Sequence, residues 1–304
     1  MKRIGILTAW MLFAATLGGW AQAYTVYFKE NTSKDAQGNP ATKPPLQAIS
    51  IKKSGDQIVL TRQVGPGMVN DTIPLSAVSQ IVFPEPPDIK AANDLLAQNQ
   101  AEAALAKIEP IVAFFAEFRD LPGNRWPQAA LAKCYALIAL NREPQAEALI
   151  TELNRTAGND SDYARYAQVQ LSSNYLKKQQ YKQVIPLLEQ VVKGTQNAQL
   201  LADAWIRKGS AHLALRQYEQ ALISFLHIPV LYAENKPLQP PALLGTARAY
   251  NGIEDFDRSV KTYDELIAQF SASPEAAAAK KELPKTKERL QQKLKQAEKD
   301  KAKG

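Results

Sequence analysis

The sequence predicts a mainly α-helical chain, an α-solenoid of about five helical hairpins preceded by a small β-rich domain. Three observations predict it. Short alternating apolar runs typical of strands fill residues 24–83, whereas Ala, Leu, Gln, Glu and Lys at helical spacing dominate residues 88–283. Between them, residues 84–87 read Pro-Glu-Pro-Pro, through which neither a helix nor a central strand can run. The third observation is an internal repeat in the helical part.

Residues 1–23 have the composition of a secretory signal peptide. Lys2-Arg3 precedes an apolar run from Ile4 to Leu17, and Ala21-Gln22-Ala23 forms a cleavage site of small residues. The run is short for a membrane span, and no later stretch is longer. Cys134, the only cysteine, lies far beyond this run, so no lipid anchor is expected. We expect cleavage after Ala23 and a periplasmic or secreted chain without a transmembrane segment.

The repeat consists of small or apolar residues twelve apart, one in each helix of a predicted hairpin. Between the last four first members the steps are 38, 37 and 38 residues, longer than the usual period of about 34. An aromatic residue stands three positions before the second member in three units: Tyr181, Tyr218 and Phe256. The five pairs are Ala92 with Ala104, Cys134 with Ala146, Ser172 with Val184, Gly209 with Ala221, and Ala247 with Ser259.

Residues 202–228 resemble one tetratricopeptide (TPR) repeat, with Trp205, Gly209, Ala221 and Phe225 at positions 4, 8, 20 and 24 of that pattern. The resemblance implies two antiparallel helices that cross closely at Gly209 and Ala221, with Trp205 and Phe225 filling the space beside the crossing. The segment 263–274 is similar to the repeats of periplasmic envelope TPR proteins (BamD- and CpoB-like repeats). The resemblance covers residues 88–283.

The same resemblance implies a concave groove, lined by the first helix of each hairpin, that binds a protein or peptide partner. The function expected from it is a non-enzymatic interaction scaffold in cell-envelope assembly or maintenance. Two alternatives are open: a structural subunit of a homo-oligomer or larger envelope complex, and a polysaccharide-binding protein acting through residues 24–83. The groove residues that the resemblance implies are Gln128, Tyr135, Tyr166, Ser173, Lys177, Asp203, Ser210, Arg248 and Asn251.

No motif for catalysis, cofactor binding or metal binding is present. A Gly-rich phosphate loop, a G-x-S-x-G motif, an H-E-x-x-H motif and a cysteine pair are all missing from the sequence. We therefore expect no catalytic residue, no cofactor and no metal site. His212 and His227 stand fifteen residues apart and are interpreted as structural or surface residues.

The formal net charge of +7 is concentrated in the C-terminal tail. Residues 280–304 hold ten Lys/Arg against four Asp/Glu, so the body of the chain is close to neutral. Acidic residues are interspersed and aromatic residues are missing there, which argues against nucleic acid as a partner. Two interpretations of residues 284–304, a basic helical or disordered tail, are open: a solvated segment that aids solubility, or a weak contact of residues 280–304 with anionic surfaces.

Helix boundaries can also be predicted. Asp88 is expected to cap the first helix and Ser273 the last, with Pro274 at the first helical position. Pro110 is expected to kink or divide the second helix of the first unit, and Pro284 to end the capping helix.

Overall fold

The computed structural model describes residues 24–29, 43–84, 86–119, 121, 123–156 and 162–301. The chain divides into two compact units, Met1–Leu140 and Asn141–Gly304. The predicted signal peptide and the last three residues of the predicted tail lie outside the described residues. The domain boundary at residues 84–87 stays a prediction.

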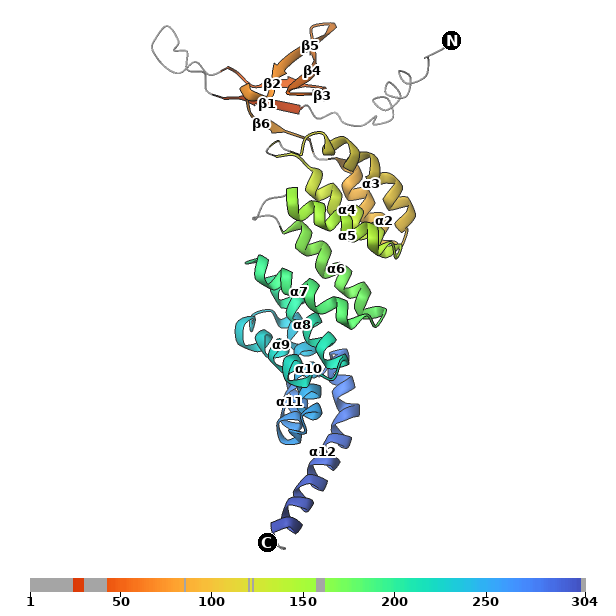
Figure 1. Ribbon diagram of the computed structural model, residues 1–304, viewed down its shortest axis with the longest axis vertical. Coiled ribbons are helices and arrows are strands. Elements are labelled where there is room, and N and C mark those ends of the chain that lie inside the picture. The colour runs from red at the N-terminus through yellow and green to blue at the C-terminus, as the bar shows by residue number, and fades with distance from the viewer. Residues whose placement is uncertain are drawn as a thin grey trace, which may run out of the picture. The chain divides into compact units, whose positions relative to one another are not determined.

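The strands form two antiparallel three-stranded sheets (Figure 1). Both hairpin turns of the second sheet hold a glycine in the left-handed region, Gly55 and Gly65, with φ of 62° and 58°. A 3₁₀ turn, η1 (Leu75–Ala77), precedes the last strand. The first sheet has the order β2 (Leu46–Ala48), β1 (Tyr24–Phe28), β6 (Val78–Val82), and the second the order β3 (Ser50–Ser54), β4 (Gln57–Val64), β5 (Gly67–Pro74). The small β-rich region is therefore confirmed.

An aromatic cluster packs the end of β6 against the helices of the first unit. The ring centroid of Phe83 lies 5.4 Å from that of Phe115 and 5.4 Å from that of Phe118, and all three side chains are buried. Such edge-to-face contacts add to the burial of apolar area. The first three helices are α2 (Pro87–Ala97), α3 (Ala101–Ala116) and α4 (Trp126–Ala139).

The prediction that Asp88 caps α2 is wrong. The helix begins at Pro87, and its N-cap residue, Pro86, makes no side-chain cap hydrogen bond. Asp88 lies inside the first turn and pairs with Lys107 of α3 at 3.1 Å. Proline at the first helical position needs no donor partner, so the helix can start two residues earlier than expected.

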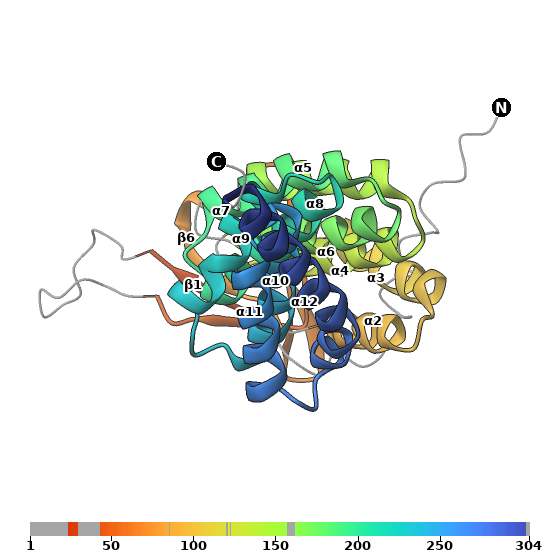
Figure 2. The ribbon, with the colours of Figure 1, turned by 90° about the horizontal axis from the view of Figure 1, so that it is seen from below.

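The second unit is an array of helical hairpins closed by a long C-terminal helix, which confirms the predicted mainly helical architecture. The pairs α6–α7, α8–α9 and α10–α11 pack together, and α12 packs on α10 and α11 (Figures 1 and 2). The helices are α5 (Glu143–Thr156), α6 (Tyr163–Lys177), α7 (Tyr181–Gly194), α8 (Ala198–Ala214), α9 (Tyr218–Leu231), α10 (Gln239–Gly252), α11 (Phe256–Gln269) and α12 (Pro274–Lys301), with a 3₁₀ turn, η2 (Lys236–Leu238).

Neither Pro110 nor Pro284 divides its helix. The expected break at Pro284 is wrong, and of the two outcomes expected at Pro110, a kink or a division, the division is excluded. Each lies inside one assigned helix, α3 and α12 respectively. Pro284 and Lys280, four residues earlier, are both exposed, so water can bind the carbonyl that loses its intrahelical donor. Ser273 caps α12 as predicted, its Oγ accepting the Ala276 N–H at 3.0 Å.

Five turns between helices share one backbone device. Each has a non-glycine residue in the left-handed region, seven residues after the first small residue of its pair. At four of them the next N–H donates to the carbonyl five residues back, as Gln217 does to His212 at 2.9 Å, which is the Schellman pattern. These residues are Asn99, Asn141, Gln179, Arg216 and Glu254, with φ between 56° and 61°. Because the turn has the same backbone conformation each time, the second helix of every hairpin begins at the same repeat position.

Candidate functional site

The first helices of the hairpins in the second unit form a row. Helix α8 contacts α6 and α10, and α12 continues the row against α10. Helices α7, α9 and α11 each contact two consecutive members of the row. We call α6, α8, α10 and α12 the first-helix row. Seven of the predicted groove residues lie on α6, α8 and α10. Tyr166, Lys177 and Arg248 are exposed, whereas the other four, Ser173, Asp203, Ser210 and Asn251, are half-buried.

The spacing within the row depends on two glycines that contact one aromatic ring. A Cβ added to Gly209 of α8 would lie 2.9 Å from the Phe225 ring, and one added to Gly245 of α10 would lie 2.4 Å from it. Phe225 belongs to α9 and is buried. The predicted crossing at Gly209 and Ala221 is therefore filled by Phe225. Trp205 does not fill this space as predicted. Its side chain is half-buried, and its ring stacks on that of His227 with 3.7 Å between the ring centroids.

On α6, Tyr166 is exposed and its position is fixed from α8. Its hydroxyl accepts a hydrogen bond from Asn197 Nδ2 at 3.2 Å, while Asn197 Oδ1 accepts the N–H groups of Gln199 and Leu200 and so caps α8. Lys177, three turns later on α6, is exposed. The aromatic ring is thus presented at the joint between two members of the row.

The predicted serines make local hydrogen bonds. Ser173 donates to the Val169 carbonyl at 3.2 Å, and Ser210 donates to the Ile206 carbonyl at 2.9 Å. Each hydroxyl keeps its lone pairs for a partner donor. The half-buried Asp203 accepts a hydrogen bond from Gln199 Nε2 at 3.3 Å.

Arg248 and Asn251 are engaged by the chain's own C-terminal helix. Arg248 donates from Nε and Nη2 to the two carboxylate oxygens of Glu282, at 3.0 and 2.6 Å. Asn251 donates to Thr286 Oγ1 at 2.7 Å and accepts from Arg289 Nη1 at 2.6 Å. In the last hairpin, α12 therefore covers the two predicted groove positions of α10.

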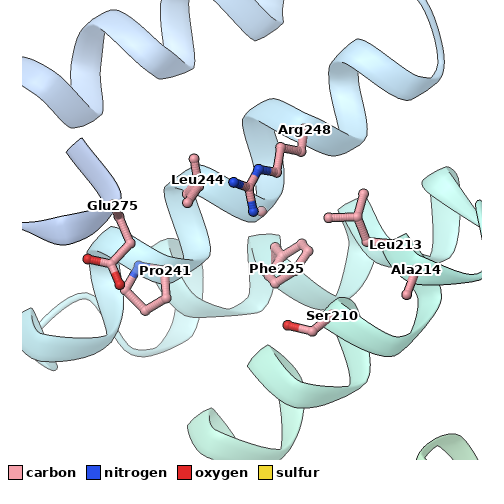
Figure 3. A pocket seen from close by; sticks show the side chains of 9 residues that line it. Ser210, Leu213, Ala214, Phe225, Pro241, Leu244, Arg248 and Glu275 are labelled. Atoms are coloured by element: carbon pink, nitrogen blue, oxygen red, sulfur yellow. The ribbon is translucent and has the colours of Figure 1, made fainter. Parts of the chain in front are cut away.

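A cavity of about 350 Å³ lies between α8 and α10, at the start of α12 (Figure 3). Its lining is mostly apolar, and Arg248 and Glu275 bring charge to it from α10 and α12. Two of the predicted groove residues, Ser210 and Arg248, line this cavity. The full lining is Ser210, Leu213, Ala214, Phe225, Pro241, Leu244, Gly245, Arg248 and Glu275.

Arg207 on α8 is a residue that the sequence analysis missed. Its side chain is half-buried, and its Nε is buried without a hydrogen-bond partner in the described part of the chain. Burial lowers the pKa of its guanidinium, an effect that the charge of Asp203 partly offsets. The sequence did hold a signal for it: Arg207 is a charged residue at the repeat position that Gly245 occupies in α10.

Two predicted residues, Gln128 and Tyr135, lie on α4 in the first unit and are both half-buried. Gln128 Oε1 accepts from Arg125 Nη1 at 3.3 Å. Whether a partner contacts any of the nine predicted residues stays a prediction.

The two histidines make structural contacts. His212 is buried and its Nδ1 lies 2.7 Å from Gln217 Oε1, across the turn between α8 and α9. His227 Nδ1 donates to the Ile223 carbonyl at 2.7 Å. Within the described ranges, no group of three His, Cys, Asp or Glu side chains has a geometry suited to a metal ion. Nor does any helix described there combine the length and apolarity needed to cross a bilayer.

Known proteins of similar structure are built from TPR repeats. Nearly identical TPR-like repeats of Podosopora anserina, assigned to a kinesin light chain, align with a TM-score of 0.48 and 18% identity over 60% of this chain and 92% of theirs. YrrB, a TPR protein with an unusual peptide-binding site, aligns with a TM-score of 0.44 and 19% identity over 64% of this chain and 91% of its own. No family model and no curated protein matches the sequence.

Proposed function

We propose that this chain is an exported, non-enzymatic scaffold that binds a protein or peptide partner along the first-helix row. The observation that carries the proposal is the row itself: three consecutive first helices present polar side chains, exposed or half-buried, and the exposed ring of Tyr166, beside a cavity. Such a surface suits an extended segment or a partner helix. Its Tyr166 supplies rigid aromatic area, the kind of contact that dominates interface energetics.

We further propose that the partner lies in the cell envelope and that the chain takes part in envelope assembly or maintenance. The support is in the sequence: a leading apolar run that ends in a small-residue cleavage site, and a final repeat similar to those of periplasmic envelope TPR proteins. A weak contact of residues 280–304 with anionic surfaces is proposed in addition, because most side chains from 287 to 300 are exposed and the segment is basic.

Site-specific photocrosslinking in intact cells tests the scaffold function. A photoreactive phenylalanine analogue is placed at Ser173 or Ser210 on the row, or at Ile223 on α9 as the control. Ile223 is a suitable control because its side chain is 59% exposed and α9 is not part of the row. We expect one partner protein to be captured from both row positions and not from Ile223. Capture from Ile223 alone would place the interface elsewhere and refute the proposal.

A further inference from the structure

The cavity between α8 and α10 is lined by Gly245, at a repeat position where the other first helices carry side chains. Two residues before the first small residue of each pair, the chain has Lys90, Ala132, Gln170, Arg207 and Gly245. A Cβ at residue 245 would lie 2.4 Å from the Phe225 ring. The Phe225 ring packs directly against the backbone of α10 at this glycine and lines the cavity from beneath, although it is itself almost fully buried.

The two charged residues that line the cavity differ in their pairing. Arg248 is neutralised by Glu282, which also accepts a hydrogen bond from the Tyr263 hydroxyl at 2.8 Å. Glu275 is half-buried and has no hydrogen bond or ion pair to any residue described in the structure. It is not needed as a cap either, since Ser273 fills that role. The cavity thus has a mostly apolar lining and one carboxylate, in the first turn of α12, that the helix dipole favours but that no side chain in the described residues pairs with.

We propose that this cavity receives a lysine or arginine side chain from an extended segment of the partner, with the cationic group at Glu275. The inference rests on the proposed function, because it takes that segment to lie along the first-helix row. A long basic side chain can lay its methylenes along Phe225, Leu213 and Leu244 and keep its charged end at the rim. The volume of about 350 Å³ is at the lower end of the range for ligand sites, about 300–1,000 Å³, and suits one side chain.

The negative charge of Glu275 favours a basic side chain in the cavity over an acidic or an apolar one. An acidic side chain would bring a like charge to Glu275. An apolar one would cover the carboxylate without giving it a partner, which costs the desolvation of that group. A lysine or arginine instead forms a charge-assisted hydrogen bond, the stronger class of these interactions. The cavity therefore selects for a basic residue at one fixed place in the partner segment.

Peptide display on the full chain tests the selection. Random short peptides are selected on the wild type, on Glu275→Lys, and on Glu265→Lys as the control, since Glu265 is an exposed acid on α11 outside the row. We expect peptides enriched on the wild type to share one lysine or arginine, and Glu265→Lys to enrich the same peptides. On Glu275→Lys the shared position should change to aspartate or glutamate. Wild-type peptides should bind this variant about tenfold or more weakly, the loss of one charge-assisted contact.

A second pair of variants tests whether the basic residue enters the cavity. Ala214 lines it and is exposed, and Ala139 is an exposed alanine at the same repeat position of α4. Ala214→Leu should narrow the cavity and weaken the binding of the enriched peptides severalfold. Ala139→Leu should leave their binding unchanged. All variants should keep the wild-type thermal unfolding midpoint within a few degrees.

The possible results separate the two proposals. Enriched peptides that share no basic position, or whose preference Glu275→Lys leaves unchanged, would overturn the basic side chain and leave the scaffold function standing. Peptides that bind all variants equally and crosslink only through Ile223 would refute the first-helix row as the binding surface, and the cavity with it. No enriched peptide on any variant, together with capture from Ser210 by photocrosslinking, would overturn the extended segment as the form of the partner.

Discussion

Arg248 on α10 and Glu282 on α12 form a bidentate ion pair, with hydrogen bonds of 3.0 and 2.6 Å from Nε and Nη2. The Tyr263 hydroxyl of α11 donates to the same carboxylate at 2.8 Å. One acidic side chain thus joins the last three helices of the array. Terminal elements of a solenoid need such closure, because they lack a further repeat to pack on.

The Glu282 pair makes stability depend on pH in the acid range. The hydrogen bonds from Arg248 lower the pKa of the Glu282 carboxyl below its ordinary value of 4.5, with a smaller contribution from Tyr263. A lowered pKa stabilises the fold fully above the ordinary value, and this stabilisation is lost as the pH falls through the folded pKa. Glu282→Gln should therefore cost about 0.5–1 kcal/mol at neutral pH, because solvent screens a pair this exposed, and almost nothing in strong acid.

Urea unfolding of the wild type and of Glu282→Gln at neutral pH and in strong acid measures this difference. Glu265→Gln serves as the control, since Glu265 only accepts a hydrogen bond from Gln269 within α11. A Glu282→Gln deficit that is the same at both pH values would show that the carboxylate does not act through its charge.

The left-handed turns predict a stabilising substitution. Arg216 is exposed with φ of 58°, a conformation that an L-residue with a Cβ adopts at a cost of about 1–2 kcal/mol. Glycine avoids that cost but loses more backbone entropy on folding. Arg216→Gly should therefore raise the free energy of unfolding by about 0.5–1 kcal/mol, whereas Arg216→Ala should not. Denaturant unfolding checks both, and a loss of stability in Arg216→Gly would contradict the Schellman turn.

The sequence could predict the repeat but not all of its contacts. Gly209 and Ala221 revealed the hairpin because close helix packing requires small side chains at a fixed spacing. The role of Gly245 was missed, since it serves a ring from the neighbouring hairpin and no motif within one repeat records that contact. The left-handed residues were missed for a different reason: they are Asn, Gln, Arg and Glu in place of the glycine that normally signals such a turn.

At the C-terminal end of the array, the sequence predicted the groove residues but not their contacts with the last helix. Repeat positions identify Arg248 and Asn251 as surface residues of a first helix, and this is where the structure places them. Their contacts with Glu282, Thr286 and Arg289 depend on a helix that the sequence was expected to end at Pro284. Local propensity, which disfavours proline inside a helix, was overridden because the carbonyl that loses its donor is exposed to water.

Phe225 should matter more to stability than Trp205. Phe225 is buried between two glycines, so Phe225→Ala is expected to cost about 3–5 kcal/mol. Trp205 is half-buried, and Trp205→Ala should cost less, about 1–3 kcal/mol. Gly245→Ala, which places a methyl group against the Phe225 ring, should be destabilising alone and partly rescued by Phe225→Leu. Thermal unfolding of the four variants gives the order, and the reverse order for Phe225 and Trp205 would contradict the packing.

Export predicts a defined N-terminus. If residues 1–23 form a signal peptide, the mature chain begins at Tyr24 and its intact mass lacks the first 23 residues. Ala23→Leu should block processing, because the cleavage site needs small residues, whereas Ala14→Leu within the apolar run should not. Mass spectrometry of the envelope fraction decides, and a wild-type chain that still begins at Met1 would refute the prediction.

Binding by the first-helix row, and not by the basic tail, predicts a particular response to salt. Exposed lysines attract any anion, and physiological salt screens this attraction over a Debye length of about 8 Å. A row of fixed side chains instead offers shape and directed hydrogen bonds. Truncation after Leu283 is a poor test, since it would also remove the contacts of Thr286 and Arg289 with Asn251. Lys295→Gln with Lys299→Gln is better, because both side chains are exposed and neither forms an ion pair in the described residues.

The matched variant on the row is Tyr166→Ala with Lys177→Ala, which leaves the Arg248 pair intact, and Tyr166→Phe is its control. Binding to the partner captured through Ser210 is measured at low and physiological salt. We expect the tail variant to bind about as the wild type does at physiological salt and the row variant to lose about tenfold or more, the effect of truncating an aromatic contact worth at least 1.4 kcal/mol. If the tail variant loses binding at physiological salt while the row variant binds normally, the tail is the binding site and the row is not.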